Sequence, residues 1–233
     1  MFYKKLLASC VFFSALCTSA WAVDPATVQT QAQAQPGTVD LSKIQTKPEK
    51  GTVALTFDDG PTADLTPQVL AILKKYGVHA TFFVMAGHAK EHPEIVKQEL
   101  AEGNPVANHT IWHPQLTKLS DEKLRVEVGD ASKIITSIIN KPPVCLRPPF
   151  FATNKKVAEV VHQNGMQQVM GFMTEDYTDM GTQKLVDHVL KNVHSGSVLV
   201  FHDTHKQTVE ALPAIIEGIK KKGLGISVIC AQP

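Results

Sequence analysis

The sequence is poor in cysteine, in net charge and in long apolar runs, and each shortage excludes a class of protein. Four cysteines among 233 residues are too few for a disulfide scaffold. A formal net charge of +1 at pH 7 argues against nucleic acid as a partner, because binding it usually requires a clustered basic face. No apolar run reaches the length of a convincing membrane span. One globular domain with a sizeable core remains as the expectation.

The N-terminus has the pattern of a secretory signal peptide. Two lysines lie within the first five residues, residues 6–16 are mostly apolar, and Ala20-Trp21-Ala22 provides small residues for a signal peptidase. We therefore expect cleavage after Ala22 and a secreted or periplasmic protein with 21 basic and 22 acidic residues. An alternative is a lipoprotein acylated at Cys10, but only a very short apolar region precedes that cysteine.

The remaining chain divides into a leader and one domain. Residues 23–49 are rich in Gln, Thr, Ala and Pro and lack periodicity, which predicts a flexible leader. Residues 50–233 form the expected catalytic domain. This domain retains Cys145 and Cys230, both in apolar segments, so either one disulfide or two buried thiols fit the sequence. No motif indicates an oligomeric state.

The domain alternates short apolar runs with amphipathic segments. Strands are expected at 52–57, 80–84, 105–108, 144–148, 167–172, 197–202 and 225–229. Helices are expected near 64–76, 91–102, 121–139, 154–164, 182–194 and 208–222. This repeated alternation predicts an α/β fold with parallel strands and outer helices, in which an open doubly wound sheet and a closed barrel both remain possible. In either fold, the active site lies at the carboxyl ends of the strands.

The polar residues that stand out follow these strand ends. They are Asp58, Asp59, His109, Arg147, Asp176, Asp179 and His202. Because the carboxyl ends of parallel strands meet at one edge, we expect these side chains to share a rim.

His109 and His113 are four residues apart in the segment HTIWH. In a helical turn, this spacing would place both imidazoles on one face, where they can bind one ion. Zinc in a hydrolytic site typically takes three protein ligands and leaves one position for water. One acid of the pair Asp58-Asp59 completes such a set, and the other is then free to accept a proton from water. Zn²⁺ is the expected ion, with Co²⁺ or Ni²⁺ as alternatives.

Two further residues have expected roles in proton transfer. His202 ends an apolar strand and can protonate a leaving group, a task for which His205 is a weaker candidate because it lies in the following loop. Arg147 is a permanent cation among apolar residues, and we expect it to orient the free acid of the Asp pair or to pair with an acid after the fifth strand.

The motifs TFDDG, HTIWH followed by Pro114, RPPF and FHD resemble those of NodB-type polysaccharide deacetylases, in the same order. The resemblance covers about residues 50–230. It implies a distorted (β/α) barrel of about seven parallel strands and a metal-dependent carbohydrate esterase. It implies Asp58 as general base, His202 as general acid, and Asp59, His109 and His113 as metal ligands.

The same resemblance implies three supporting roles. The backbone N–H of Phe150 would bind the oxyanion, Arg147 would steer Asp58, and Asp176 would orient His202, with Asp179 as second choice. The sequence departs from the family at Phe150-Phe151, where Tyr-Gly is usual, and mildly at Val200 in place of Leu. Met180 stands where Trp is usual. These changes alter the expected shape of the acetyl and sugar pocket.

The expected activity is removal of N-acetyl groups from N-acetylglucosamine-containing glycans, either peptidoglycan or chitin-like oligosaccharides. One alternative is an O-acetyl esterase that acts on xylan. Another is a glycan-binding pseudoenzyme, which the retention of Asp58, Asp59, His109, His113 and His202 argues against. An acetylated glycan is the only partner that these motifs imply.

Overall fold

The computed structural model describes residues 40–178 and 180–231. The expected signal peptide, most of the expected leader and Asp179 lie outside these ranges. Eight strands occur in the described part of the chain. They are β1 (Thr52–Asp58), β2 (Thr81–Val84), β3 (Val106–Asn108), β4 (Cys145–Leu146), β5 (Gln167–Gln168), β6 (Phe172–Met173), β7 (Val198–His202) and β8 (Gly225–Ile226).

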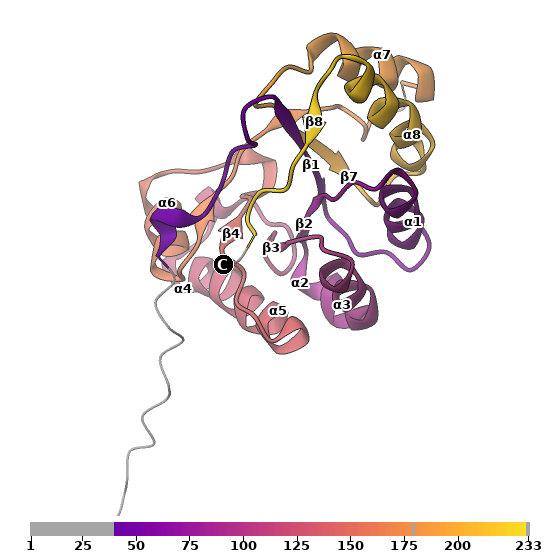
Figure 1. Cartoon of the computed structure of the whole chain (residues 1–233). Coiled ribbons are helices and arrows are strands. Elements are labelled where there is room, and N and C mark those ends of the chain that lie inside the picture. The colour runs from indigo at the N-terminus through magenta and orange to yellow at the C-terminus, as the bar shows by residue number, and fades with distance from the viewer. Residues whose placement is uncertain (1–39, 179, 232–233) are drawn as a thin grey trace, which may run out of the picture. The chain divides into compact units, whose positions relative to one another are not determined.

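The strands form one parallel sheet in the order β5-β4-β3-β2-β1-β7-β6, and β8 pairs with the start of β1. Helices surround the sheet, which curls into a distorted barrel (Figure 1). This confirms the prediction of about seven parallel strands with outer helices. The central strand β1 pairs with β2 from Thr56 and with β7 from Ala54, so its carboxyl end is held on both sides.

The expected strand 167–172 is two strands at opposite ends of the sheet. Residues Gln167–Gln168 pair with β4, whereas Phe172–Met173 pair with β7. The chain crosses from one end to the other at Gly171, where a β-carbon would lie 2.5 Å from the Val200 side chain. No ladder joins β5 to β6 among the described residues, so the barrel is open at this seam.

The alternation of side chains along β1 separates the core from the site. Val53, Leu55 and Phe57 point outward into the main hydrophobic core beneath the helices. Ala54 belongs to a smaller cluster inside the barrel, and Thr56 and Asp58 follow it at the same period of two. The inside of the barrel therefore becomes polar toward its carboxyl end.

Eight α-helices occur in the described residues. They are α1 (Thr66–Tyr76), α2 (Ala86–Glu91), α3 (Pro93–Ala101), α4 (Asp121–Arg125), α5 (Ala131–Ile139), α6 (Lys155–Gln163), α7 (Thr182–Asn192) and α8 (Lys206–Lys221). Short 3₁₀ segments occur at Leu41–Lys43, Leu116–Lys118 and Pro149–Phe151.

The structure divides one of the helical regions expected from the sequence and contains one further helix. A π-helical segment, Val126–Asp130, separates α4 from α5 within the region 121–139. The helix expected near 91–102 corresponds to α3, and the short helix α2 before it was not predicted from the sequence. His92 lies between these two helices with a non-helical backbone, directly before Pro93.

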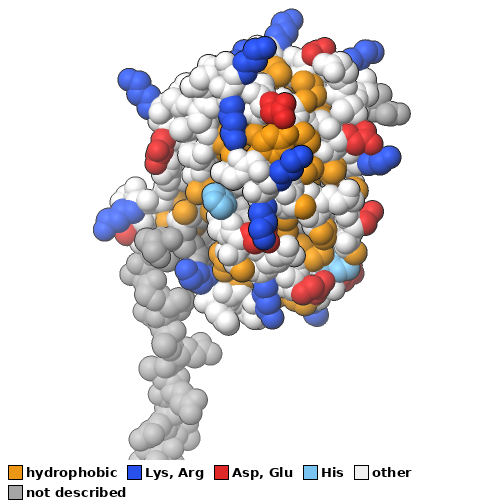
Figure 2. Space-filling model, turned by 45° about the vertical axis from the view of Figure 1, so that its right-hand side comes forward, with side chains coloured by type: hydrophobic (Ala, Val, Ile, Leu, Met, Phe, Trp, Pro, Cys, Tyr) orange, Lys and Arg blue, Asp and Glu red, His pale blue; other side chains and the backbone are white. Residues whose placement is uncertain are grey.

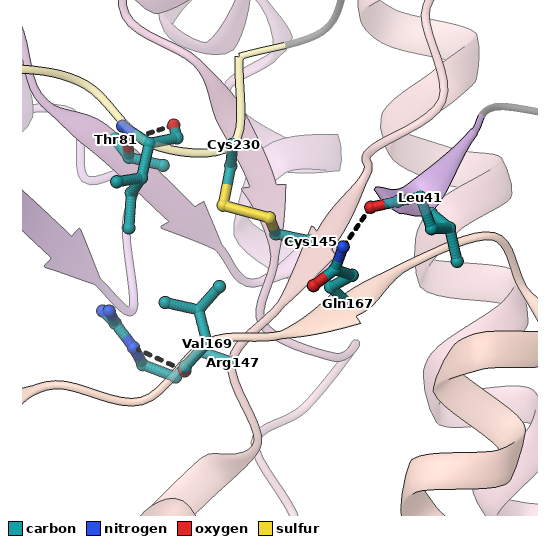
Figure 3. The surroundings of a disulfide bond; sticks show 8 residues. Leu41, Thr81, Cys145, Arg147, Gln167, Val169 and Cys230 are labelled. Atoms are coloured by element: carbon teal, nitrogen blue, oxygen red, sulfur yellow. Dashed lines mark hydrogen bonds between the residues drawn. A yellow bond between two sulfur atoms is a disulfide. The ribbon is translucent and has the colours of Figure 1, made fainter. Parts of the chain in front are cut away.

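Residues 40–49, at the end of the expected leader, pack against the domain. Ile44 is buried in the cluster inside the barrel. The backbone N–H of Cys230 donates to the carbonyl of Gln45 at 2.7 Å, and the Gln167 amide donates to the carbonyl of Leu41 (Figure 3).

Cys145 and Cys230 form a disulfide, which settles the choice that the sequence left open. The bond joins β4 to the C-terminal segment (Figure 3). Both cysteines are buried inside the barrel. The disulfide therefore fixes the C-terminal segment to β4 at Cys145, which lies two residues before Arg147.

The surface carries mixed charge. On the face drawn in Figure 2, Lys and Arg side chains alternate with Asp and Glu, and hydrophobic atoms lie between them. No basic patch gathers on this face. Among the described helices, none has the length and hydropathy needed to cross a bilayer.

Candidate active site

Asp58 and Asp59 both face the carboxyl rim of the barrel, although they are neighbours in sequence. Asp58 ends β1 and continues its regular alternation toward the inside. Asp59 follows with φ of 75°, in the left-handed region, and Gly60-Pro61 has a cis peptide bond. Because the extended backbone ends at Asp59, the second carboxylate turns to the same side as the first.

Three side chains converge beside this turn. Oδ1 of Asp59 lies 3.3 Å from Nε2 of His109 and 3.6 Å from Nε2 of His113. The candidate ligand atoms of Asp59, His109 and His113 all lie within 4.8 Å of one another. Each residue comes from the end of a strand or the loop after it, so the parallel sheet brings them together.

The two histidines meet without the helical turn that their spacing suggested. Residues 109–113 are irregular, and Thr110 and His113 have φ of 70° and 57°. Side chains hold this loop instead. Oδ1 of Asn108 accepts from the Thr110 N–H at 2.7 Å, and the Glu127 carboxylate accepts from the N–H of Ile111 at 2.9 Å. The two imidazoles therefore lie close together, as their spacing suggested, but without the helical turn on which that expectation rested.

The donor set fits a divalent cation. Oδ1 of Asp59 is buried and has no hydrogen-bond partner in the described structure, as expected for an oxygen that binds an ion. Nδ1 of His109 donates to the carbonyl of Arg147 at 2.8 Å, which orients the ring so that Nε2 faces Asp59. Two imidazole nitrogens and one carboxylate are a typical zinc set.

The charges of the site also suit metal binding. Burial alone would raise the pKa of Asp59, but contact with His109 and the charges of His113 and His202 lower it to about 2. Burial and the neighbouring His109 lower the pKa of His113, which favours the neutral imidazole that binds metals.

Arg147 lies inside the barrel beneath Asp58. Its side chain is fully buried, and Nη1 donates to Oδ1 of Asp58 at 2.6 Å and to Oγ1 of Thr56 at 2.8 Å. Nε donates to the carbonyl of Val169 (Figure 3), and the guanidinium stacks over the Phe83 ring at 4.0 Å. Asp58 is thus fixed through one oxygen, and its Oδ2 lies 4.0 Å from Nε2 of His109.

His202 and Asp176 form a second pair on the other side of the site. Nδ1 of His202 lies 2.8 Å from Oδ1 of Asp176, whose Oδ2 accepts from the backbone N–H of His202 at 2.7 Å. Burial disfavours the imidazolium, but the hydrogen bond and charge of Asp176 and the charges of Asp58 and Asp59 raise the pKa of His202 to about 9. Nε2 of His202 remains as the atom that can give a proton.

The two acids and the three histidines of the site line one pocket of about 450 Å³, whereas Arg147 and Asp176 lie behind its surface. Its lining is Asp58, Asp59, His109, His113, Pro148, Phe150, Phe151, Met173, Tyr177, His202 and His205. Phe150 is 66% exposed, and the centroid of its ring lies 4.6 Å from that of His113. Tyr177 is 53% exposed, and its ring centroid lies 5.8 Å from that of His202. Two exposed aromatic rings therefore flank the pocket, one beside each half of the site.

The departures from the family pattern fall in two different places. Phe150 and Phe151 both have left-handed backbones, with φ of 58° and 53°, and both line the pocket. Met180 instead packs against the outer hydrophobic core. Met173 and Tyr177 line the wall of the pocket near His202.

Several supporting residues were not predicted from the sequence. Nδ1 of His88, from α2, lies 2.8 Å from the carbonyl of Asp59. The Thr208 hydroxyl donates to Asp176 at 2.5 Å, and the Gln207 amide donates to the Asp176 carbonyl at 3.1 Å. Each contact joins elements far apart in the chain, so no local pattern could have revealed it.

Comparison with known proteins points to one family. The sequence profile described as polysaccharide deacetylase matches residues 45–169. A peptidoglycan-N-acetylglucosamine deacetylase of Bacillus cereus is 38% identical over 177 residues, which cover 73% of this chain and 83% of that protein. A chitooligosaccharide deacetylase of Rhizobium leguminosarum bv. trifolii is 33% identical over 189 residues, covering 75% of this chain and 88% of that protein.

Solved structures agree with the sequence comparison. The peptidoglycan deacetylase PdaC from Bacillus subtilis superposes with a TM-score of 0.72 at 34% sequence identity. The superposition covers 78% of this chain and 89% of that structure. Most of the described domain therefore shares the fold of an enzyme whose sequence is also related.

Proposed function

The chain belongs to the polysaccharide deacetylase family, and from this premise we propose that it is a metal-dependent hydrolase of N-acetylated glycans. Its substrates contain N-acetylglucosamine, as in peptidoglycan or chitin-like oligosaccharides, the materials for which its relatives are named. The observation that carries the proposal is one pocket in which Asp59, His109 and His113 lie beside Asp58 and His202.

Asp59, His109 and His113 would hold the ion, for which Zn²⁺ is the first choice. When bound, it would supply Lewis-acid polarisation of the acetyl carbonyl and a lowered pKa of water. Asp58 accepts the proton of the attacking water through Oδ2, while Arg147 holds Oδ1. The backbone N–H of Phe150 donates to the oxyanion that forms at the former carbonyl.

His202 completes the reaction as general acid. With Nδ1 engaged by Asp176, its Nε2 donates a proton to the departing amine as the C–N bond breaks. The raised pKa of His202 keeps the imidazolium populated near neutral pH. Acetate and a free amino sugar are the products.

The protein acts outside the cytoplasm. The signal-peptide pattern of residues 1–22 supports this location, as do relatives named for peptidoglycan.

The test is acetate release from a substrate panel by the zinc-loaded protein. The panel holds chitin oligomers, peptidoglycan and acetylxylan. We expect release from at least one of the two amino-sugar substrates. Release from acetylxylan alone would instead show an O-acetyl esterase, and glycan binding without release from any substrate would show a pseudoenzyme.

A further inference from the structure

Asp203 is a fully buried carboxyl that follows His202 and has no place in the mechanism above. Its Oδ2 accepts a hydrogen bond of 2.5 Å from the Thr66 hydroxyl. Its Oδ1 is buried with no hydrogen-bond partner in the described structure. A buried carboxyl with one unpartnered oxygen is costly, which calls for a reason for its presence.

The Asp203 carboxyl lies against the backbone of Gly60. A β-carbon added to Gly60 would lie 2.1 Å from Oδ2 and 2.4 Å from Oδ1 of Asp203. These separations are far below van der Waals contact, so only glycine fits at this position. The neighbour of Gly60 in the chain is Asp59, the candidate metal ligand.

Thr66 connects the same carboxyl to the rest of the loop. Its hydroxyl oxygen accepts from the backbone N–H of Thr62 at 2.8 Å while it donates to Asp203. The Thr62 hydroxyl in turn accepts from the N–H of Leu65 at 3.3 Å. The segment from Asp59 to Thr66 is therefore anchored on Asp203.

The other side of the Asp59-Gly60 turn is held by α2 and the residue before it. The backbone N–H of Met85 donates to the Gly60 carbonyl at 3.0 Å, and His88 contacts the Asp59 carbonyl. Asp59 itself has a left-handed backbone, which is strained for a non-glycine residue and persists only where the surroundings enforce it.

We propose that Asp203 is a positioning residue for the metal site: with Thr66, it presses on Gly60 and keeps the Asp59 carboxylate turned toward His109 and His113. This inference rests on the proposed function, because it takes Asp59 as a metal ligand. Asp203 and His202 are adjacent, so the end of β7 would position both the acid and the metal loop.

The experiment measures the zinc dissociation constant of folded protein by competition with a chromogenic chelator. The variants are Asp203→Ala, Asp203→Asn and Thr66→Val. Loss of an outer contact typically weakens metal binding about 10–100-fold, and we expect this for Asp203→Ala and Thr66→Val. Asp203→Asn retains an acceptor of the same shape and should bind zinc much more tightly than Asp203→Ala.

Glu99→Gln is the matched control. Glu99 is also fully buried and has no hydrogen-bond partner for its carboxyl oxygens in the described structure. Burial and the charge of Asp203 raise its pKa well above the ordinary value, so glutamine is a close substitute. No described hydrogen bond joins its side chain to the metal loop. This variant should keep the wild-type zinc affinity, even where its melting temperature changes.

A double variant separates positioning from general loss of stability. Gly60→Ala should weaken zinc binding because its methyl group displaces the Asp203 carboxyl. Gly60→Ala with Asp203→Ala should bind zinc no more weakly than Asp203→Ala alone, because the clash is gone.

The outcomes distinguish the two claims. Folded Asp203→Ala with wild-type zinc affinity would overturn the positioning role and leave the proposed function intact. If Asp203→Ala fails to fold, Thr66→Val decides in the same way. A wild-type protein that binds no zinc would overturn the proposed metal site, and the inference with it.

Discussion

Nη1 of Arg147 lies 2.6 Å from Oδ1 of Asp58, and both side chains are buried inside the barrel. The contact joins the end of β1 to the residue after β4, across β2 and β3. It leaves Oδ2 of Asp58 facing His109. One ion pair therefore orients the candidate base and links two strands of the barrel.

Loss of this arginine should destabilise the protein. Removing one partner of a buried ion pair typically costs about 3–5 kcal/mol, because the other charge stays buried without compensation. We expect Arg147→Met to lower the free energy of unfolding by that amount in urea denaturation, and Arg147→Met with Asp58→Asn to recover part of it. The control is Lys133→Met, which breaks an exposed pair of 2.8 Å and should cost at most about 1 kcal/mol. Equal effects of Arg147→Met and Lys133→Met would contradict this account.

The two neighbouring acids should respond differently to the same change. Asp58→Asn should keep the zinc and lower kcat by about 10²–10⁴-fold, because it removes the proton acceptor. Asp59→Asn should weaken zinc binding together with activity, because it removes a charged ligand. Zinc content and acetate release measured on the same samples test this division. Zinc loss in Asp58→Asn with full retention in Asp59→Asn would reverse the assignment.

The alkaline limb of the pH profile should report His202. Its pKa is raised to about 9, so the imidazolium is present below that pH and is lost as the pH rises through it. Activity that needs this acid should therefore fall near pH 9. Asp176→Asn removes the main stabilising charge and should move the limb to lower pH, toward about 6.5.

Thr208→Val is the control for that shift. It removes a hydrogen bond to Asp176 but keeps the carboxylate charge beside His202. The alkaline limb of its pH profile should therefore move less than that of Asp176→Asn. The profile of kcat/KM against pH measures both variants. An alkaline limb that stays in place in Asp176→Asn would show that another group carries it.

The disulfide should contribute to stability. Cys145 and Cys230 are 85 residues apart, and linking a long loop restricts the unfolded chain. We expect replacement of both cysteines by alanine to lower the free energy of unfolding by about 2–5 kcal/mol. Each single variant should lose nearly as much as the double variant, because either change breaks the same bond. Thermal and urea unfolding without reductant measure this, and a double variant as stable as wild type would refute it.

The positive φ of Phe151 predicts that glycine is more stable than alanine at this position, the reverse of the usual order in a strand. Its φ of 53° suits glycine better than alanine, so Phe151→Gly should be more stable than Phe151→Ala by about 1 kcal/mol. At Phe172, in β6 and without a positive φ, the ordinary order should hold, with alanine the more stable. Denaturation midpoints of the four variants compare the two positions. The same order at both positions would show that φ at Phe151 has no energetic consequence.

The sequence predicted which candidate site residues lie at the carboxyl ends of strands. Asp58, His109, Arg147 and His202 each end or follow a predicted strand, and parallel pairing alone brings them to one edge. The alternation of strands and helices was likewise enough to predict the layers. It left open whether the sheet was an open doubly wound sheet or a barrel, and only the family resemblance favoured a barrel.

Contacts between distant segments could not be predicted from the sequence. Residues 169–171 carry the chain across the seam between β5 and β6, whereas periodicity reads the whole segment 167–172 as one continuous strand. Asn108 and Glu127 hold the loop that carries His109 and His113. The left-handed backbones within this loop could not be predicted, because no glycine marks them in the sequence. The roles of His88 and Asp203 likewise arise only in three dimensions.

Metal dependence is tested by acetate release from a chitin oligomer by protein stripped of metal and then titrated with Zn²⁺. We expect no release from the stripped protein and a rate that rises until one zinc is bound per chain, at the site of Asp59, His109 and His113. Undiminished release by the stripped protein, or no release from the chitin oligomer or from peptidoglycan at any zinc level, would contradict this expectation.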